Sequence, residues 1–355
     1  MLFASNWRRP TLSVLSIALI ATTVVLGQTQ RKVTKLAEGV YEIEHSHNGG
    51  GNTTVIVGKR QVFVVDSCFL PSAAREDIAQ IRQWTNVPVS FVLNTHFHND
   101  HNFGNRVYLD AFPGLTIIAH VETKKDMDLF GPGSLMREEK DSYGFQKMLE
   151  MGKTPDGVAL TEEQKQEVKT VLAGKTAVIE ELKQIKFQSA TLTFDHDFSL
   201  DLGNRQVEVK YLGRGNTSGD AMVYLPKERI VVAGDLVAYP LPNMIDGYPA
   251  EWVQTLQNLA NLDADTIVPG HGPILHDKSY VYLLRDFMKS AVDQVNEKLR
   301  QTSPAMFQTV DDVRGAVDLS PFRQRFAGND KDLGIAFDDV SAELVKLVFQ
   351  EASAR

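Results

Sequence analysis

Cysteine is almost absent from this 355-residue sequence, and its scarcity excludes one common way of stabilising a fold. Cys68 is the only cysteine, so no disulfide can form within the chain. It does not follow a signal-like apolar run, which excludes a lipid-attachment site, and no histidine neighbours it in sequence. An ordinary, partly buried thiol is therefore expected. The sequence also lacks a G-x-S-x-G segment, which excludes the nucleophile elbow of many serine hydrolases.

Basic residues are also relatively few, since acidic residues outnumber them. The chain has 37 Lys and Arg against 45 Asp and Glu, which gives a formal net charge of −8 at pH 7. Because the basic residues are scattered, no positively charged stripe is available to bind nucleic acid. A content of 43% hydrophobic and 23% charged residues is typical of a globular enzyme with a substantial core. The expected partner is therefore a small-molecule substrate.

The longest apolar run is short and lies near the N-terminus. Arg8 and Arg9 precede the largely apolar residues 12–26, and small residues follow this run. This order predicts a cleavable signal peptide over residues 1–27, with a mature chain that begins near Gln28. A spanning helix needs about 20 apolar residues, so no stable membrane span is expected after cleavage. The predicted location is the periplasm or the extracellular medium.

Strand-like and helix-like segments follow the N-terminal region. The expected strands are apolar, rich in β-branched residues and bounded by turn residues. Their ranges are 40–44, 53–58, 61–66, 89–94, 190–194, 206–212, 221–226, 229–235 and 265–272. Helical spacing of apolar residues appears over 72–84 and 251–262. The recurrence of strands and helices in two similar halves predicts two packed sheets with helices outside.

Two further stretches are expected to be helical. Residues from about 121 to 187 form a predicted helical insertion, in which Thr161 and Gln164 make a candidate capping box. Residues from about 277 to 352 are predicted to contain the C-terminal helices. The insertion is interpreted as packing over the domain rather than as a separate module.

The segment THFHNDH, residues 95–101, carries the strongest chemical signal. It directly follows an expected buried strand, where α/β folds usually place their functional loops. His96 and His98 are two apart on an extended loop and point in similar directions, so both can bind one metal. Asp100 and His101 then project towards a neighbouring position. Imidazole nitrogen combined with carboxylate oxygen favours zinc and similar metals.

These residues resemble the metallo-β-lactamase superfamily. HFHNDH matches its HxHxDH signature, and GRGNTSGDAMVYLP, VVAGDL and IVPGHG follow in the family's order. The resemblance spans roughly residues 33–275, interrupted by the helical insertion. It implies an α/β fold, an αββα sandwich with the site at one edge, formed within residues 28–355.

The resemblance also implies two neighbouring metal positions. The ligands of the first are His96 and His98, and those of the second are Asp100, His101, Asp235 and His271. Asp66, at the end of an expected strand, corresponds to an aspartate that braces the site through hydrogen bonds.

One position departs from the family pattern. The third histidine of the first metal site is replaced by Asn216, whose neutral carboxamide is a poorer zinc ligand than imidazole. Three outcomes are open. The second site acts alone with one zinc; or Asn216 or Asp220 completes a weaker first site with zinc, manganese or iron; or the first site stays empty and activity is low or lost.

The function implied is an exported zinc-dependent hydrolase that uses a metal-bound hydroxide. Its substrate carries an ester, lactone, thioester or amide bond, with β-lactams included. Asp100 is also the candidate catalytic residue, since its carboxylate can orient or deprotonate the water. Ala238 stands where many metallo-β-lactamases have a lysine that holds the β-lactam carboxylate, which lowers the expectation of efficient antibiotic hydrolysis. The alternative is a non-catalytic metal-binding or ligand-binding protein that keeps the fold with an impaired first site.

Overall fold

Two β-sheets form the centre of the molecule. The computed structural model describes residues 31–45, 50–155, 157–184, 186–301 and 309–353. The first sheet has seven strands in chain order. They are β1 (Arg31–Ala37), β2 (Val40–His45), β3 (Thr53–Val57), β4 (Val62–Val65), β5 (Val89–Asn94), β6 (Thr116–His120) and β7 (Leu192–Phe194). Neighbours are antiparallel from β1 to β4 and parallel from β4 to β7.

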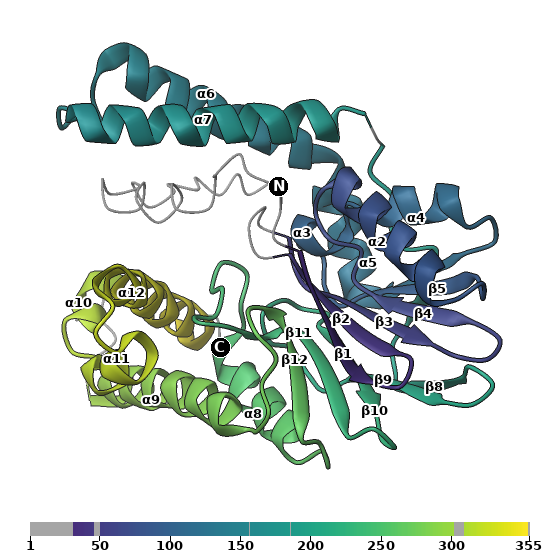
Figure 1. Ribbon diagram of the computed structural model, residues 1–355. Helices are drawn as coiled ribbons and strands as arrows, with labels where there is room; N and C mark the ends of the chain where they lie inside the picture. Colours follow the sequence, from purple (N-terminus) through teal and green to yellow (C-terminus); the bar gives the residue numbers. More distant parts are fainter. Residues whose placement is uncertain (1–30, 46–49, 156, 185, 302–308, 354–355) are drawn as a thin grey trace, which may run out of the picture.

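The second sheet has five strands in the order β12-β11-β10-β9-β8. They are β8 (Phe198–Asp201), β9 (Gln206–Tyr211), β10 (Ala221–Leu225), β11 (Ile230–Ala238) and β12 (Thr266–His271). All neighbours in this sheet are antiparallel except β11 and β12, which run parallel. Figure 1 shows the two sheets packed face to face.

A continuous apolar layer holds the two sheets together. Ile56 and Phe63 of the first sheet belong to the same buried cluster as Val207, Val223 and Val232 of the second. The central strands β4, β10 and β11 are buried on both faces. This explains why their sequences read as nearly unbroken apolar runs rather than as alternating patterns.

Helices cover the outer face of each sheet. Helices α2 (Pro71–Trp84) and α4 (Asn105–Ala111) pack on the first sheet through the cluster that includes Ile78 and Tyr108. Helices α8 (Pro249–Ala260), α9 (Ser279–Gln301) and α12 (Lys331–Ser353) cover the second sheet, together with the short α10 (Val310–Arg314) and α11 (Ser320–Ala327). The molecule is therefore an αββα sandwich, which confirms the predicted fold class.

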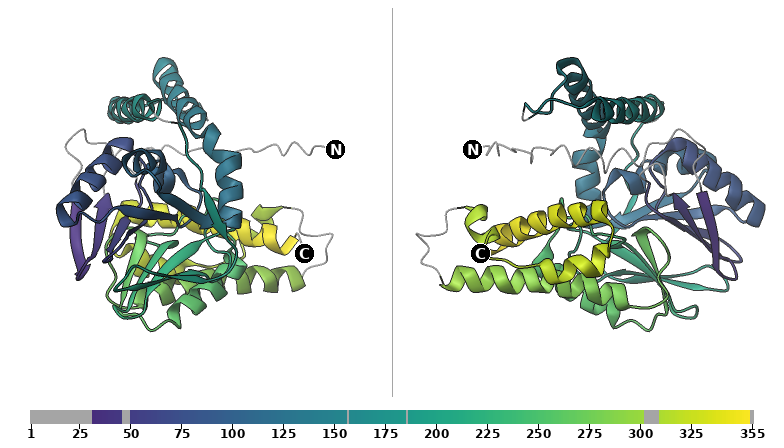
Figure 2. Two further views of the ribbon diagram at one scale, coloured as in Figure 1. Left: turned by 90° about the vertical axis from the view of Figure 1, so that its right-hand side faces the viewer. Right: turned by 60° about the vertical axis from the view of Figure 1, so that its left-hand side comes forward.

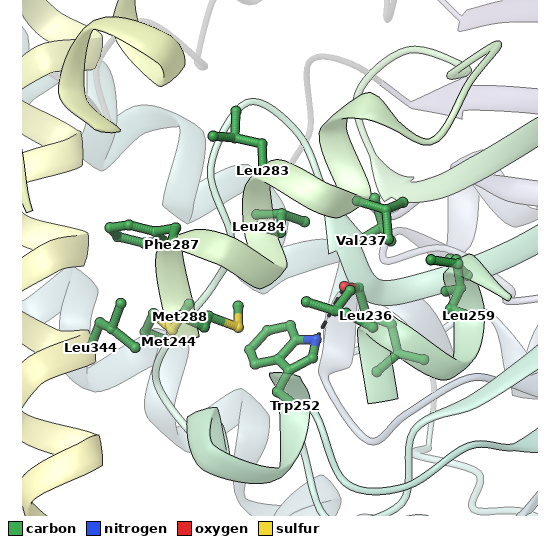
Figure 3. Close-up of a cluster of buried hydrophobic side chains, with 14 of the residues drawn as sticks. Leu236, Val237, Met244, Trp252, Leu259, Leu283, Leu284, Phe287, Met288 and Leu344 are labelled. Atoms are coloured by element: carbon green, nitrogen blue, oxygen red, sulfur yellow. Dashed lines mark hydrogen bonds between the residues drawn. The ribbon is translucent and has the colours of Figure 1, made fainter. Parts of the chain in front are cut away.

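Trp252 of α8 fixes the helices of the second sheet. Its ring is fully buried in the large apolar cluster, beside Leu284 and Met288 of α9 (Figure 3). Its indole N–H donates to the backbone oxygen of Leu236 at 3.2 Å, so the ring buries its apolar area without losing a hydrogen bond. This contact ties the outer layer to β11.

The helical insertion projects beyond the sandwich. It consists of α5 (Val121–Phe130), the 3₁₀ turn Gly131–Gly133, α6 (Ser134–Met151) and α7 (Glu162–Leu182). Figures 1 and 2 show α6 and α7 as a hairpin that stands away from the sheets. The hairpin has a small apolar core of its own. The predicted capping box is confirmed: Thr161 Oγ1 accepts from Gln164 N, and Gln164 Oε1 accepts from Thr161 N.

The expected signal peptide, residues 1–27, lies outside the described residues. Among the helices that the structure does describe, none is both long and apolar enough to cross a membrane.

The two sheets meet at the edge where the candidate site lies. The carboxyl ends of β4 and β5 lie together because these strands are parallel. At this edge Ala221 N donates to Thr95 O at 2.8 Å, and Asn52 N donates to Gly270 O at 2.7 Å. These bonds join the loops of the first sheet to β10 and β12 of the second. The loops that carry HFHNDH, GNTSGD and PGHG are thereby brought to one place.

Candidate metal centre

The metal-binding loop, residues 95–101, is held by its own polar neighbours. Thr95 N donates to Asp66 Oδ1 at 2.8 Å as β5 ends, and the short α3 (Asn99–Asn102) follows. The side-chain amide of Asn102 donates to the backbone oxygens of Phe97 and His98, both at 2.8 Å. The loop is therefore rigidly shaped by local hydrogen bonds.

Asp66 has an unusual backbone conformation. Its φ of 59° lies in the left-handed region, which Asp tolerates better than most residues. The resulting turn after β4 directs the carboxylate towards Thr95 and His101. A residue keeps this unfavourable backbone conformation only where surrounding contacts stabilise it, which is common at functional sites.

The first cluster consists of His96, His98 and Asp235, whose ligand atoms lie within 4.8 Å of one another. His96 Nε2 is 2.9 Å from His98 Nδ1, and Asp235 Oδ2 is 3.7 Å from His96 Nε2. Asp235 comes from β11, so the second sheet supplies a carboxylate to the histidines of the first.

The second cluster consists of Asp100, His101 and His271. His271 Nε2 is 3.0 Å from Asp100 Oδ2 and 3.2 Å from His101 Nε2. Asp235 Oδ1 reaches this cluster too, at 3.4 Å from His101 Nε2 and 3.6 Å from His271 Nε2. The structure thus brings together all six predicted ligands, and Asp235 faces both clusters instead of the second alone.

Two glycines allow this close approach. A Cβ at Gly270 would lie 2.0 Å from Asp235 Oδ1, and one at Gly51 would lie 2.2 Å from His101 Cε1. Real Cβ atoms do not approach other atoms so closely, so both positions require glycine. The first glycine of PGHG, Gly270, is therefore explained by the position of the Asp235 carboxylate.

Partners outside the clusters set the orientation of three histidine rings. Thr95 Oγ1 donates to Asp66 Oδ2 at 2.9 Å and lies 3.0 Å from His96 Nδ1, so it accepts the proton of that nitrogen. His101 Nδ1 donates to Asp66 Oδ2 at 2.9 Å. Each ring thereby directs the lone pair of its Nε2 towards the clusters. Such outer hydrogen bonds are the usual companions of metal-binding imidazoles.

Asp246, which no sequence motif indicates, orients the third ring, that of His98. Its Oδ2 lies 3.0 Å from His98 Nε2, which donates to the carboxylate. The lone pair of His98 Nδ1 therefore points at His96 Nε2, 2.9 Å away. Two lone pairs at this distance repel unless a cation or a proton lies between them. This pair of facing nitrogens fits a metal ion.

Unsatisfied oxygens support the same conclusion. Asp235 Oδ1 and Asn216 Oδ1 are both buried and accept no hydrogen bond. A buried acceptor without a donor costs roughly 1–3 kcal/mol, so it indicates a missing partner. Asp235 Oδ1 faces the ligand nitrogens of His101 and His271, so a cation at the second cluster would satisfy it, and this carboxylate fits a metal centre.

Asn216 occupies the predicted place beside the first cluster. Its side chain is fully buried, and Nδ2 lies 3.4 Å from His98 Nδ1. The oxygen and nitrogen of a carboxamide exchange places by a flip, which would direct Oδ1 at the same point as His98 Nδ1. Asp220 is differently engaged: its Oδ2 accepts from Thr217 N at 2.7 Å, and burial raises its pKa to about 7. Asp220 Oδ1 is buried without a hydrogen-bond partner, as Asn216 Oδ1 is, but the contact of Asn216 with His98 makes Asn216 the better placed of the two to complete the first cluster.

The charges of the site favour a cation. Burial lowers the pKa of His96 well below its usual range, which keeps this ring neutral and able to act as a ligand. Burial also opposes a charge on His101, but the Asp100, Asp235 and Asp66 carboxylates outweigh it and raise the pKa of His101 well above its usual range. The second cluster therefore attracts positive charge, which a proton or a metal ion supplies.

An Asp246→Asn variant is expected to weaken metal binding at the first cluster by about 10–100-fold, as other outer-partner substitutions do. A neutral amide no longer fixes the proton on His98 Nε2, so Nδ1 becomes a poorer ligand. The affinity would be measured by competition with a chromogenic chelator, and the tautomer of His98 by nitrogen-15 NMR.

Asp126→Asn is the matched control for this variant, since Asp126 contacts Ser218 nearby without touching a candidate ligand. If Asp246→Asn kept both the affinity and the tautomer of the parent, Asp246 would not be a positioning residue.

The helical insertion is anchored on the metal-binding loop. The ring of Phe130, at the end of α5, lies 5.5 Å from that of Phe97, and Ser134 Oγ donates to Asn99 Oδ1 at 2.8 Å. Thr123 Oγ1 donates to Gly219 O at 2.6 Å, which ties α5 to the loop that contains Asn216. The start of the insertion therefore packs against the candidate site.

Another group of potential ligands lies elsewhere in the described part of the chain. His45, Cys68 and Asp77 approach one another, and His45 Nε2 is 3.1 Å from Asp77 Oδ2. Arg31 already pairs with Asp77 Oδ1 at 2.9 Å. Burial and then the charge of Asp77 raise the pKa of Cys68 well above its usual range, which leaves a neutral thiol, a poor ligand. We interpret this group as a buried hydrogen-bonded network.

Known proteins have sequences similar to this one. The model of the metallo-beta-lactamase superfamily matches residues 48–271. A linear primary-alkylsulfatase from a Pseudomonas species is 26% identical over 255 residues, which cover 67% of this chain and 44% of the relative. A metallo-beta-lactamase type 2 from a Bacillus species is 34% identical over 97 residues, which cover 26% of this chain and 37% of the relative. The chain thus matches less than half the length of these relatives.

Solved structures share the fold. The metallo-beta-lactamase from Pontibacter korlensis has a TM-score of 0.52 at 20% identity, covering 73% of this chain and 99% of that chain. FIM-1 from Pseudomonas aeruginosa, solved in its mono-zinc form, has a TM-score of 0.51 at 17% identity, covering 74% of this chain and 96% of that chain. At these identities the similarity concerns the fold alone.

Proposed function

Because the chain belongs to the metallo-beta-lactamase superfamily, we propose that it is an exported, zinc-dependent hydrolase of an ester, lactone, thioester or amide bond. The superfamily consists of metal-dependent hydrolases. Export is proposed from the signal-like segment of residues 1–27. One observation carries the catalytic part of the proposal: the facing nitrogens of His96 and His98 and the two-sided carboxylate of Asp235 form an open metal centre.

The donor set supports a catalytic rather than a purely structural centre. Structural zinc sites are usually closed by four cysteine or histidine ligands. Here two carboxylates contribute, and the Asp100 side chain remains 27% exposed beside His271. A bound zinc ion supplies a nucleophilic water-derived oxygen near neutral pH and polarises the bond to be cleaved. Asp100 is placed at the open side, where its carboxylate can accept a proton from the attacking water.

Asn216 affects how many ions take part. The second cluster offers Asp100, His101 and His271 with Asp235 Oδ1, a complete set of four donors. The first cluster has only two histidines, Asp235 Oδ2 and the neutral amide of Asn216. We propose that the second cluster binds zinc more tightly, and that the first binds zinc, manganese or iron more weakly.

The name of one relative suggests a second candidate bond. The Pseudomonas relative is an alkylsulfatase, and it matches two thirds of this chain in a single alignment. Sulfate-ester hydrolysis needs the same water activation, so a sulfate ester is the second candidate substrate. Efficient β-lactam hydrolysis is less favoured, because Ala238 stands where many lactamases have a lysine.

The proposed activity is tested with a panel of chromogenic esters, thioesters, lactones, sulfate esters and β-lactams, with and without a chelator. We expect turnover of at least one substrate class, loss of this turnover on chelation, and its recovery after zinc is added back. The chelator should also lower the melting temperature, since zinc at 100 times its Kd stabilises a protein by about 2.7 kcal/mol.

The non-catalytic alternative predicts a different pair of results. Chelation would lower the melting temperature, but no substrate of the panel would show metal-dependent turnover. A melting temperature that does not respond to zinc or chelator would contradict both proposals.

A further inference from the structure

Exposed apolar side chains lie on both sides of the candidate metal centre. On one side, the Phe97 ring is 4.8 Å from that of His98, and the Phe130 ring is 5.5 Å from that of Phe97. Phe130 is 40% exposed, and its neighbour Leu129 is 70% exposed. Apolar surface therefore leads outward from the metal-binding loop onto the helical insertion.

On the other side is the connection between β11 and α8, which carries Asp246 to His98. Ile245, directly before Asp246, is 62% exposed, whereas Met244 is buried in the apolar cluster of the second sheet. The buried Met244 and the paired Asp246 fix this segment at both sides of Ile245. The exposed isoleucine is thus held near the metal centre.

The insertion holds its apolar residues equally firmly. Ser134 is fully buried and donates to Asn99, which lies between two candidate ligands in the metal-binding loop. Thr123, at the start of α5, is buried and bonded to Gly219 O. Ligand-binding sites combine apolar side chains with a few fixed polar groups, and both kinds of group are held beside this metal centre.

The ion pairs of the candidate ligands favour recognition of an apolar rather than an anionic tail. Within the described residues, the ion pairs of the candidate ligands are formed only with other side chains of the centre, and none involves a Lys or Arg. The candidate ligands thus hold no basic group beside them for an anionic tail, whereas an apolar tail would find the exposed side chains of Phe130 and Ile245.

We propose that Leu129, Phe130 and Ile245 bind the apolar chain of the substrate, with the buried ring of Phe97 supporting Phe130 beside the metal-binding loop. The substrate class is an amphiphilic ester whose alkyl or acyl chain lies on this surface while its polar group lies at the metal centre. This proposal deepens and rests on the proposed hydrolase function.

The test is equilibrium binding, which does not depend on turnover. Straight-chain carboxylates from butanoate to dodecanoate, below their micelle concentrations, are titrated into the zinc-loaded full chain by calorimetry. We expect Kd to fall by roughly two- to fourfold for each added methylene, as burial of apolar area predicts, until the chain extends beyond the surface.

Phe130→Ala and Ile245→Ala are each expected to flatten this dependence on chain length. Two separate segments are tested, so a folding defect in one variant does not decide the result. Val158→Ala is the matched control, because Val158 is 53% exposed on the same insertion but lies in the α6–α7 connection. It should leave the whole series unchanged.

Equal affinity for all chain lengths would overturn the proposal, as would a dependence that neither variant alters. A concentration-dependent dimer that both variants abolish would assign the surface to a second copy of the chain instead. A chain-length dependence without turnover of any ester would contradict the hydrolase function while leaving apolar binding established.

Discussion

An Asp235→Ala variant is expected to lose metal at both clusters and to lose chelator-sensitive turnover with it. Asp235 Oδ2 lies 3.7 Å from His96 Nε2, and Oδ1 lies 3.4 Å from His101 Nε2. One substitution therefore removes a ligand and a negative charge from both positions. Since changing an outer partner alone costs about 10–100-fold, we expect metal affinity to fall by more than about 100-fold. Elemental analysis after dialysis against limiting zinc measures this loss.

The control for Asp235→Ala is Asp128→Ala, which removes an exposed carboxylate that pairs with Lys124 on α5. It should keep its full metal content. If Asp235→Ala lost only one of two ions, Asp235 would serve a single cluster. A variant with the parent's metal content and turnover would exclude Asp235 as a ligand.

An Asn216→His variant is expected to bind zinc more tightly at the first cluster. Imidazole is a better zinc ligand than a neutral carboxamide, and position 216 adjoins His98 Nδ1 at 3.4 Å. Under limiting zinc, we expect the metal content to rise from about one towards about two ions per chain. The reason is that the first cluster would then offer zinc four good ligands. The increase should appear in elemental analysis and in the cobalt(II) spectrum, independently of activity.

The imidazole ring is larger than the carboxamide it replaces, and the stability lost by fitting it provides a second measurement. Asn216 is fully buried, and overpacking a buried site typically costs about 1–3 kcal/mol. The variant should therefore melt below the parent without zinc and recover when zinc is added. Asn216→Leu, which offers no ligand, should regain only the stability that zinc at the intact second cluster gives the parent. Two tightly held ions in the parent, with no gain in the variant, would mean that Asn216 already completes the first cluster.

The predicted elements differ from the structure mainly at the edges of the sheets. The apolar runs of β3, β4, β5 and β10 predicted strands because buried strands leave long apolar signatures. In contrast, β1 (Arg31–Ala37) was not predicted, since it lies at an edge of the sheet and none of its residues is fully buried. A short apolar run such as β6 (Thr116–His120) cannot be assigned by periodicity alone.

The sequence by itself determined the family and the principal candidate ligands. His96, His98, Asp100 and His101 fall within one loop, so their spacing is encoded locally. Asp235 and His271 were identified because AGDL and PGHG keep their order in the family. Metal chemistry restricts these positions to a few residue types, and this restriction is what makes them visible in sequence.

Only the tertiary structure decided which other residues reach the centre. His98 and Asp246 are 148 positions apart and meet because the two sheets pack face to face. The same packing turns Asp235 towards both clusters, and the anchored insertion brings Phe130 to Phe97. Cys68 acquires a histidine neighbour, His45, in the same way. Such contacts depend on the geometry of layers rather than on local spacing, so no pattern along the chain predicts them.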